Sequence, residues 1–332
     1  MPNFQTFVPI PEYPFRIGYQ EHLLSLGSCF AEHIGRRLAE HHFYSLLNPY
    51  GILYNPVSIA QGLHRLLQDA PFQPGGLFEH QGLWHSFFHH GAFSHPTREE
   101  ALDAMNAAYR RTQGFLLTAN RLILTMGTAH VFVYRPSGEV VANCHKLPGT
   151  AFERRRLSPR EVIAALEPVL YELKNRQPEL EVIITVSPVR HIRDGLVENQ
   201  RSKATLLLAT GELCEQLPFA HYFPSYEIMM DELRGYRFYA ADMIHPTEVA
   251  ISYIWQRFGQ AFFDEDTQLL MQRIEKVIAA ARHRPFHPAS EPHQRFLRQQ
   301  LDIIAQLERD FSFLNLSRER AAFEQQLTGA RR

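Results

Sequence analysis

The chain has 332 residues, 45% of them hydrophobic and 12% aromatic, which is enough for the packed core of one large domain or two small ones. The 34 lysines and arginines nearly balance the 35 aspartates and glutamates, and a formal charge of -1 gives no field that would attract nucleic acid or an anionic membrane. Because the start lacks a secretory signal pattern and no run of about 18 apolar residues occurs, we expect a cytoplasmic protein.

The first informative segment is an apolar stretch, a tight turn and an amphipathic pattern. Residues 22–26 are apolar enough for a buried strand, and residues 32–40 have apolar positions four apart among charges, as in a surface helix. Ser28 and Cys29 lie between them, where free backbone N–H groups and the helix dipole favour negative charge. Nucleophiles are commonly held at such junctions. The three cysteines are widely spaced without a CxxC motif, so we expect Cys29 to be a free thiol.

The next segments predict a loop, two helices and an insertion. Residues 48–56 are dense in turn formers and indicate an ordered loop, which a helix over 57–67 follows. Residues 71–96 show no clear periodicity, and a helix is predicted over 97–113 because a threonine cap precedes two glutamates in its first turn. We therefore expect residues 70–118 to form an insertion that covers part of the fold.

Four histidines cluster in this insertion and raise the question of a metal site. The sequence has no HExxH motif, and acidic ligands nearby are few, so these side chains are expected to be surface or core histidines. We therefore expect no metal site here. The four residues are His85, His89, His90 and His95.

Strands and helices then alternate, which predicts a largely parallel sheet covered by helices on both faces. Residues 222–230 are less regular and suggest a short strand and a turn. A helix capped by Thr247 closes this part of the chain. The other expected elements are strands over 121–126 and 180–186, a hairpin of 131–134 with 139–143, and helices over 158–175 and 198–216.

Beyond residue 264 the composition changes to charged helix formers. Helices are predicted over 267–282, 293–314 and 317–327, with a proline-rich break after the first. We therefore divide the chain into residues 1–263 and a helical extension over 264–332. These helices are expected to pack on the core or to mediate self-association into a homo-oligomer.

Asp242 and His245 are spaced so that the carboxylate can accept the imidazole Nδ1 proton while Nε2 faces a cleft. Because the carboxyl ends of parallel strands lie on one edge of a sheet, this pair is expected to approach the nucleophile after the first strand. The sequence therefore predicts a nucleophile, a base and a residue that orients the base.

With these residues in place, the chain resembles the GSCFA family, which belongs to the SGNH/GDSL hydrolase superfamily. The name motif is present letter for letter at residues 27–31, and the resemblance spans roughly residues 1–260, leaving out the C-terminal helices. Other segments that resemble the family are residues 48–56, 84–93, 127–131, 187–191, 199–203 and 242–246.

The resemblance implies a three-layer α/β/α, flavodoxin-like fold, and an enzyme that acts on esters, often acetyl groups on carbohydrate, without a cofactor. It gives His245 the role of the base and Asp242 that of orienting it. When residues 26–30 are aligned with the superfamily's Leu-Gly-Asp-Ser-Leu pattern, Cys29 falls at the position of the nucleophile. We expect the helix N-terminus and an imidazole to lower the pKa of its thiol. The reverse assignment, with Ser28 as nucleophile, stays open.

The superfamily holds the developing oxyanion with a glycine N–H and an asparagine amide, and its third block contains Gly-x-Asn. Residues 127–130 of this chain read Gly-Thr-Ala-His, so other donors must contribute. We expect His130 and His191 to be second bases or substrate contacts, and Arg190 to bind an anionic group. The candidates for the oxyanion and substrate site are Gly51, Asn48, Asn55, Gly127 and Thr128.

These residues predict an ester hydrolase or O-acyltransferase that forms a covalent acyl intermediate on Cys29 or Ser28. Its partner is expected to be a small-molecule or carbohydrate ester rather than nucleic acid or a membrane. The alternative is a binding or scaffold protein that keeps the hydrolase fold without turnover, which the altered third block favours.

Overall fold

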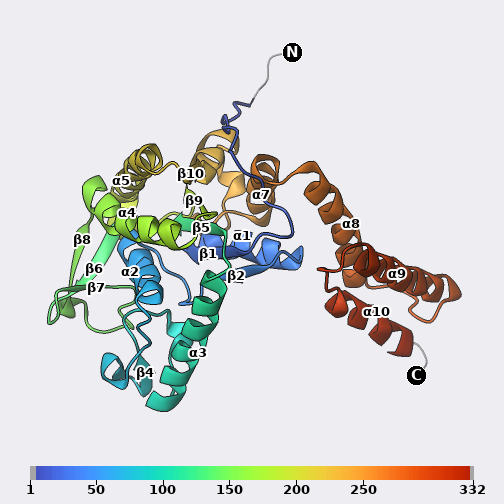
Figure 1. Cartoon of the computed structure of the whole chain (residues 1–332), viewed down its shortest axis with the longest axis horizontal. Helices are drawn as coiled ribbons and strands as arrows, with labels where there is room; N and C mark the ends of the chain where they lie inside the picture. The colour runs from blue at the N-terminus through green and yellow to red at the C-terminus, as the bar shows by residue number, and fades with distance from the viewer. Residues whose placement is uncertain (1–4, 330–332) are drawn as a thin grey trace.

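A computed structural model describes residues 5–329 (Figure 1). Its centre is a five-stranded sheet in the order β10-β9-β5-β1-β2, and every neighbouring pair is parallel. Counted along the chain, this is the order 2-1-3-4-5 of flavodoxin-like folds. The predicted three-layer fold is confirmed. The strands are β1 (Leu23–Gly27), β2 (Ser45–Leu47), β5 (Arg121–Met126), β9 (Glu181–Val186) and β10 (Ala220–Phe223).

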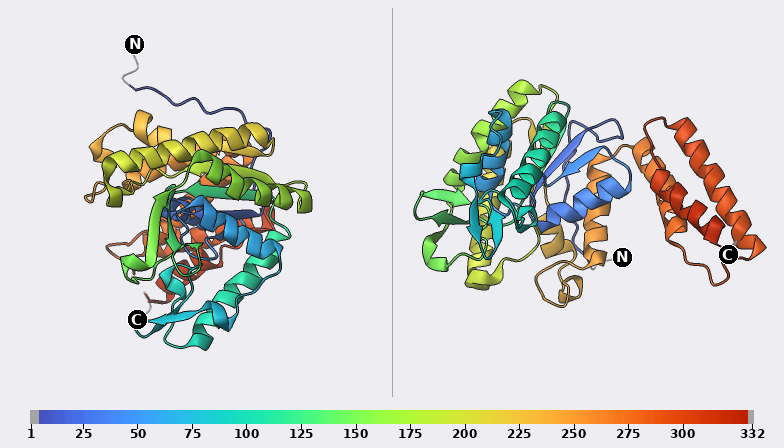
Figure 2. Two further views of the ribbon diagram at one scale, coloured as in Figure 1. Left: turned by 90° about the vertical axis from the view of Figure 1, so that its left-hand side faces the viewer. Right: turned by 90° about the horizontal axis from the view of Figure 1, so that it is seen from below.

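Helices cover both faces of this sheet, as Figures 1 and 2 show. Alternate residues of β5 point to opposite sides, so Leu122 and Leu124 join one hydrophobic core and Ile123 the other. The first core contains α2 (Pro56–Leu67), α4 (Pro159–Arg176) and α5 (Gly195–Gln216), and the second contains α1 (Cys29–Glu40) and α7 (Glu248–Phe262).

Helix α1 begins at Cys29, three residues before the predicted start. Ser28 is its N-cap and is extended, with φ -70° and ψ 177°, so the chain turns directly from β1 into the helix. The sequence pattern missed this first turn because Cys29 and Phe30 continue the apolar stretch of the strand. As a result, Cys29 itself occupies the first helical position.

The segment between α2 and β5 carries its own small elements. The hairpin of β3 (Phe78–His80) and β4 (Leu83–His85) precedes α3 (Arg98–Leu116), which packs on α2. His85 and His89 are buried in this segment, while His90 and His95 are half-buried.

A second peripheral sheet follows β5. The predicted hairpin is confirmed as β6 (His130–Tyr134) and β7 (Glu139–Val141), and β8 (Phe152–Arg156) pairs with the other side of β6. No strand was expected at β8 because four of its five residues are charged. The irregular stretch after β10 contains α6 (Ser225–Glu227) and a π-turn over Ile228–Glu232, so its predicted strand lies slightly earlier than expected.

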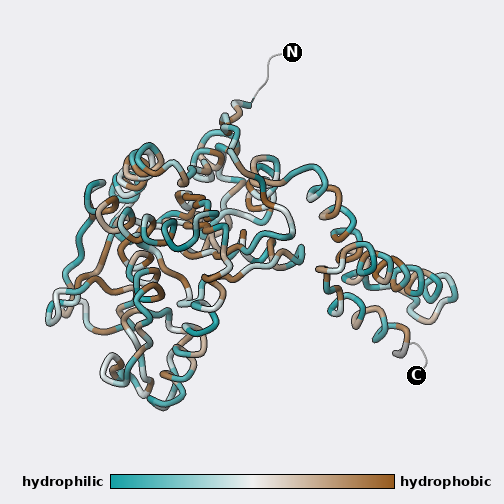
Figure 3. Tube along the Cα trace, viewed as in Figure 1, coloured by the Kyte–Doolittle hydropathy of each residue, from teal (hydrophilic) through white to brown (hydrophobic). Residues whose placement is uncertain are grey.

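Three C-terminal helices extend from the body: α8 (Glu265–Arg282), α9 (Glu291–Asp310) and α10 (Ser317–Gly329). Figure 3 shows hydrophobic and hydrophilic residues alternating along them, as in amphipathic helices. Their inward side chains, among them Ile304 and Phe323, are fully buried. Over residues 5–329, every helix is too short or too polar to cross a bilayer. The division of the chain after residue 263 stays a prediction.

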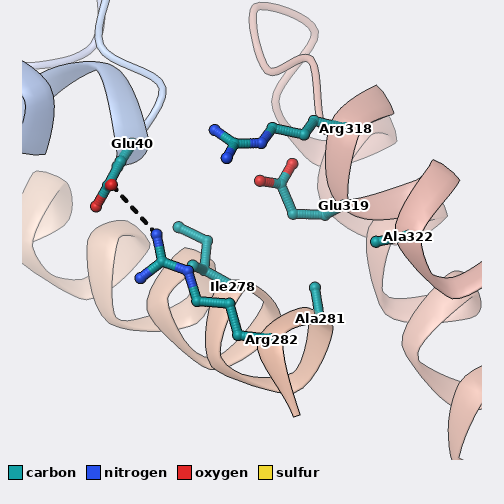
Figure 4. Close-up of a pocket in the computed structure, with 7 residues that line it drawn as sticks. All are labelled: Glu40, Ile278, Ala281, Arg282, Arg318, Glu319 and Ala322. Carbon is teal, nitrogen blue, oxygen red and sulfur yellow. Dashed lines mark ion pairs between the residues drawn. The ribbon is translucent and has the colours of Figure 1, made fainter. Parts of the chain in front are cut away.

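Charged pairs join the C-terminal helices to the end of α1. Glu40 forms an ion pair with Arg282 at 3.2 Å beside a cavity of about 160 Å³, into which Glu319 of α10 also points (Figure 4). Glu319 lies 3.4 Å from the ring of His42, and the neighbouring His41 lies 2.9 Å from Glu275 of α8. The extension is therefore docked on the body through ionisable groups. Self-association through these helices stays a prediction.

Candidate functional site

The candidate site lies at the carboxyl edge of the central sheet, between β1 and β5. The strand order reverses there, which is where open α/β sheets place their binding crevice. The loop after β2 crosses the end of β1, because Leu53 donates its N–H to the Gly27 carbonyl at 2.9 Å. The Tyr54 carbonyl then accepts from the N–H of Gly127, also at 2.9 Å. These bonds bring the segments that follow β1, β2 and β5 into one small region.

Gly27 is required by the close approach of β1 and β5. Its φ is +146°, and a Cβ there would stand 2.2 Å from the Thr125 carbonyl oxygen. Its N–H donates to Oδ1 of Asn48 at 2.9 Å, which fixes the amide of Asn48 beneath the turn. The glycine of the motif therefore sets how closely the two central strands meet.

Ser28 is fully buried and faces β5. Its Oγ has no hydrogen-bond partner within residues 5–329, and it does not cap α1. The Ser28 Cβ and the His191 Nε2 both lie 3.0 Å from the place where a Cβ on Gly127 would stand. The absence of a side chain at Gly127 thus leaves room between a hydroxyl and an imidazole, both unpartnered in the part of the chain that the structure describes.

Cys29 is half-buried at the first position of α1. Burial raises the pKa of its thiol, although the Lys203 ammonium and the backbone N–H groups of Cys29 and Phe30 pull that pKa down. The expected lowering of the Cys29 pKa was therefore wrong in its net direction, because desolvation outweighs the helix terminus. Among the groups that act most strongly on this thiol, the cation is a lysine rather than the expected imidazole.

Lys203 is a site residue that the sequence analysis did not single out. Only 1% of its surface is exposed, and its Nζ donates to the carbonyl oxygens of Gly127 and Ser187, both at 2.6 Å. Burial lowers its pKa to about 7, and the charge of Cys29 acts in the opposite direction. A signal existed, because Lys203 falls on the inward stripe that Leu206 and Leu213 continue along α5.

Asp242 and His245 form the predicted pair. His245 Nδ1 donates to Asp242 Oδ2 at 2.7 Å, and Asp242 Oδ1 accepts from the backbone N–H groups of Ile244 and His245 at 2.8 and 3.0 Å. These hydrogen bonds, led by that of the imidazole, lower the pKa of Asp242 to about 2. Both side chains are about half exposed, so the pair lies at the surface of the site. The hydrogen bond to Asp242 uses only Nδ1 of His245, which leaves Nε2 available for proton transfer.

His245 lies near the nucleophile segment, as its effect on two neighbouring histidines shows. Its charge adds to the effect of burial in lowering the pKa of His33, one helical turn from Cys29, and that of His191. Across the described residues, no hydrogen bond links His245 to Ser28 or Cys29. The catalytic assignments of these residues stay predictions.

Arg190 holds the loop that carries this pair. Its backbone N–H donates to the Ile244 carbonyl, and its Nη1 donates to the Met243 carbonyl, both at 3.2 Å. Its guanidinium also lies over the ring of Tyr239, 4.0 Å from the centroid. The predicted binding of an anionic group by Arg190 is untested, but the guanidinium already positions the loop between Asp242 and His245.

Most predicted oxyanion donors already have partners inside the protein. The N–H of Gly51 donates to the Asn48 carbonyl at 2.8 Å, and those of Gly127 and Thr128 donate to the Tyr54 carbonyl. The Thr128 hydroxyl, the donor expected from this residue, lies 3.0 Å from Ser202 Oγ and accepts from the His130 N–H. Asn55 uses its amide to cap α2. The Nδ2 of Asn48 is buried without a partner among residues 5–329, so it remains a candidate donor.

The two histidines predicted as further contacts differ in their surroundings. Burial, helped by charges such as that of Lys203, lowers the pKa of His191 to about 3. His130 lies at the start of β6, with Nε2 3.9 Å from Glu198, and burial lowers its pKa as well. His191 therefore lies closest to the turn after β1, and His130 lies beside the peripheral sheet. Within the described chain, no cluster of three or more histidine, cysteine or acidic residues is placed to hold a metal ion.

Two protein-family models match this chain. The sequence model of the GSCFA family matches residues 22–258, which include all of the site residues described above. A second model, described as the C-terminal domain of GSCFA domain proteins, matches residues 274–329. The expectation that these last helices lie outside the resemblance is therefore wrong. No curated protein was found to match the chain.

Proposed function

The chain belongs to the GSCFA family, and we propose that it is an ester hydrolase or O-acyltransferase of the SGNH type, with Cys29 as nucleophile. The observation that carries this proposal is the Asp242–His245 hydrogen bond of 2.7 Å, at the same sheet edge as a thiol on a helix N-terminus. A carboxylate that holds imidazole Nδ1–H leaves Nε2 able to accept and return a proton. His245 is the base in this proposal, and Asp242 fixes its tautomer.

The proposed reaction proceeds through a thioester. The Cys29 sulfur attacks the ester carbonyl carbon while the thiol proton passes to His245 Nε2, and a tetrahedral oxyanion forms. Its collapse breaks the carbon–oxygen bond, and the leaving alcohol takes the proton from the imidazolium. Water or another alcohol then attacks the thioester, loses its proton to His245, and leaves with the acyl group as the thiol is restored. The substrate is a small-molecule or carbohydrate ester.

Accessibility favours Cys29 over Ser28 as the nucleophile. Cys29 is half-buried, and the backbone N–H groups of Cys29 and Phe30 act to lower the pKa of its thiol, whereas Ser28 is fully buried. A substrate carbonyl is therefore expected to reach the half-buried Cys29 more readily than the fully buried Ser28. Ser28 remains the second choice because its Oγ lacks a partner in the described structure.

Asn48→Asp is expected to slow ester turnover about 10²- to 10³-fold, the usual effect of removing one oxyanion donor. Aspartate keeps the oxygen that accepts from the Gly27 N–H, but in place of the unpartnered Nδ2 it has a second oxygen, which cannot donate a hydrogen bond. The matched control is Asn55→Asp, which should keep near wild-type turnover because Asn55 only caps α2. The measurement is kcat with a chromogenic acetyl ester, and equal losses in both variants would refute a role for Asn48 in the oxyanion hole.

A second candidate function is that of a binding or scaffold protein without turnover. The partnered N–H groups of Gly51, Gly127 and Thr128 favour it, because a hydrolase needs free donors at the reacting carbonyl. In that case the helices α8 to α10 would serve assembly.

Acyl trapping tests the proposal. Wild type is mixed with p-nitrophenyl acetate, quenched in acid and analysed by intact mass and peptide mapping, beside Cys29→Ala, Ser28→Ala and His245→Ala. We expect an acetyl group on Cys29 that is absent from Cys29→Ala and present in Ser28→Ala. An adduct on Ser28 would exchange the two roles. No adduct and no nitrophenol release would support the scaffold function.

A further inference from the structure

We propose that a cavity beside Arg190 binds a carboxylate on the alcohol part of the substrate ester. This inference rests on the proposed function and adds a substrate class to it, an ester of an alcohol that also carries an acid group. Arg190 binds the acid, and Tyr236 and Tyr239 form walls for the rest of the alcohol.

The cavity lies at the carboxyl edge of the sheet, among the loops that follow β9 and β10. Arg190 supplies a positive charge to its lining, and Met229, Met230, Tyr236 and Tyr239 give it apolar walls. Its volume is about 240 Å³. Pockets that enclose a whole drug-sized ligand measure roughly 300–1,000 Å³, so this one has room for one part of a substrate.

The positive charge of Arg190 is not balanced by a carboxylate. Among residues 5–329, no carboxylate forms an ion pair with Arg190, and its one side-chain hydrogen bond runs from Nη1 to the Met243 carbonyl. Asp242, which precedes Met243, accepts instead from the His245 imidazole and from two backbone N–H groups. Because a guanidinium has five N–H donors, most of those of Arg190 are left for a ligand.

Two aromatic rings hold this guanidinium in place. Its central carbon lies 4.0 Å from the ring centroid of Tyr239 and 5.5 Å from that of Tyr236. Tyr239 is buried, and its hydroxyl donates to the Met230 sulfur at 3.7 Å, so the nearer ring is itself fixed. A guanidinium over an aromatic face keeps its N–H groups at its edge, and that planar edge matches an oxyanion such as a carboxylate.

The number of available charges favours a carboxylate over a phosphate. The second arginine in the lining, Arg234, is already paired with Asp231 at 3.3 Å. A phosphate monoester carries a charge of about -1.5 to -2 at pH 7, which one guanidinium does not neutralise. The single charge of a carboxylate matches the one unpaired cation of the cavity.

The position of the cavity beside the His245 loop assigns the acid to the alcohol part. Arg190 donates to the carbonyl oxygens of Ile244 and Met243, both at 3.2 Å. Consecutive Cα atoms are about 3.8 Å apart, so the Met243 Cα lies within about 7.6 Å of that of His245. In the proposed reaction His245 returns a proton to the leaving oxygen, which must lie beside the imidazole. The rest of the alcohol then extends from His245 toward Arg190.

Turnover of two matched esters tests the preference for an acid. The substrates are 4-acetoxybenzoate and its uncharged counterpart 4-acetoxybenzamide. The variants are Arg190→Gln, Arg190→Lys and the control Arg193→Gln, whose exposed side chain lies outside the cavity lining. In wild type and the control, we expect kcat/KM to be about tenfold or more higher for the acid, mainly through KM, as for a hydrogen bond between charged groups.

Arg190→Gln should lose this preference, and Arg190→Lys should recover part of it because the charge returns. A displaced His245 loop would slow both esters and leave their ratio unchanged, so the ratio separates binding of the acid from support of the loop. Equal kcat/KM for the two esters in wild type would overturn the proposal, and so would a preference that survives in folded Arg190→Gln.

Two further comparisons test the side and the kind of anion. Phenyl hydrogen succinate carries its carboxylate on the acyl part, and phenyl acetate is its uncharged counterpart. We expect Arg190→Gln to leave the ratio of these two esters unchanged. A ratio that depends on Arg190 here, and not for the acetoxybenzoate pair, would overturn the assignment to the alcohol. A stronger Arg190-dependent preference for 4-acetoxyphenyl phosphate would overturn the choice of a carboxylate.

Binding without turnover separates this inference from the proposed function. Calorimetry measures the affinity of 4-acetamidobenzoate, in which an amide replaces the ester, for wild type, Cys29→Ala and Arg190→Gln. We expect the first two to bind it about tenfold more tightly than 4-acetamidobenzamide, and Arg190→Gln to bind both alike. Equal binding in wild type would overturn the acid site even if Cys29 is acylated. Selective binding without any acylation would retain the acid site and remove the ester hydrolase function.

Discussion

Removing the imidazole of His245 is expected to reduce kcat/KM for an acetyl ester by about 10⁴-fold or more, the range seen when a base is removed from an acyl-transfer triad. Without Nε2, the group proposed to take the thiol proton and to return it to the leaving alcohol is lost. The measurement is steady-state hydrolysis by His245→Ala, with circular dichroism to verify the fold. A loss smaller than tenfold in a folded variant would exclude His245 as the base.

The Asp242 carboxylate gives this expectation a pH signature. Because its pKa is lowered to about 2, Asp242 stays ionised at every pH above about 3 at which ester turnover would be assayed. Its protonation therefore cannot produce a fall in rate between pH 4 and 7, and any such fall must come from another group. Asp242→Asn should lower the rate about 10⁴-fold at all these pH values, since the amide favours the wrong imidazole tautomer.

His191 provides the matched control for the base assignment. It is nearer than His245 to the turn after β1, but burial lowers its pKa to about 3, which makes it a weak proton acceptor near neutral pH. His191→Gln should therefore change the rate less than tenfold. If His191→Gln were as inactive as His245→Ala, the roles of the two histidines would have to be exchanged.

Local patterns explain why most of the fold was predictable. The capping box of α4 is an example, because Ser158 accepts from the Glu161 N–H while the Glu161 carboxylate accepts from the Ser158 N–H. Strand β2 could not be predicted from hydrophobic periodicity, because its three residues are all half-buried and the strand is defined by its pairing with β1. Strand β8 consists mostly of charged residues and forms because β6 offers it an edge.

The same distinction holds for the candidate site. Asp242 and His245 are only three positions apart, so their hydrogen bond could be predicted from the sequence. Lys203 donates to the carbonyl oxygens of Gly127 and Ser187, which are far from it in the sequence, and only the docking of α5 against the strand ends brings these groups together. The loss of free oxyanion donors was equally hidden, because it depends on where the loop through Tyr54 crosses the sheet.

Gly27→Ala is expected to destabilise the protein by at least about 3 kcal/mol, or to prevent folding. The new Cβ would stand 2.2 Å from the carbonyl oxygen and 2.8 Å from the carbonyl carbon of Thr125, and both belong to backbone that cannot rotate away. To relieve this clash, β1 and β5 would have to move apart at the point where the chain leaves β1 toward Cys29. Urea unfolding measures the loss in free energy, and the alkylation rate of Cys29 measures how far the turn has moved.

Two other glycines separate the collision at Gly27 from the strain of its backbone. Gly138 has φ +71° with open space where a Cβ would stand, so Gly138→Ala should cost only about 1–2 kcal/mol of strain. Gly149 has open space and no positive φ, and Gly149→Ala should be near neutral. If Gly27→Ala were no more harmful than Gly138→Ala, the close contact of β1 with β5 would not be what the motif glycine provides. A larger loss, with altered Cys29 reactivity, would mean that the spacing of these two strands sets the geometry of the nucleophile.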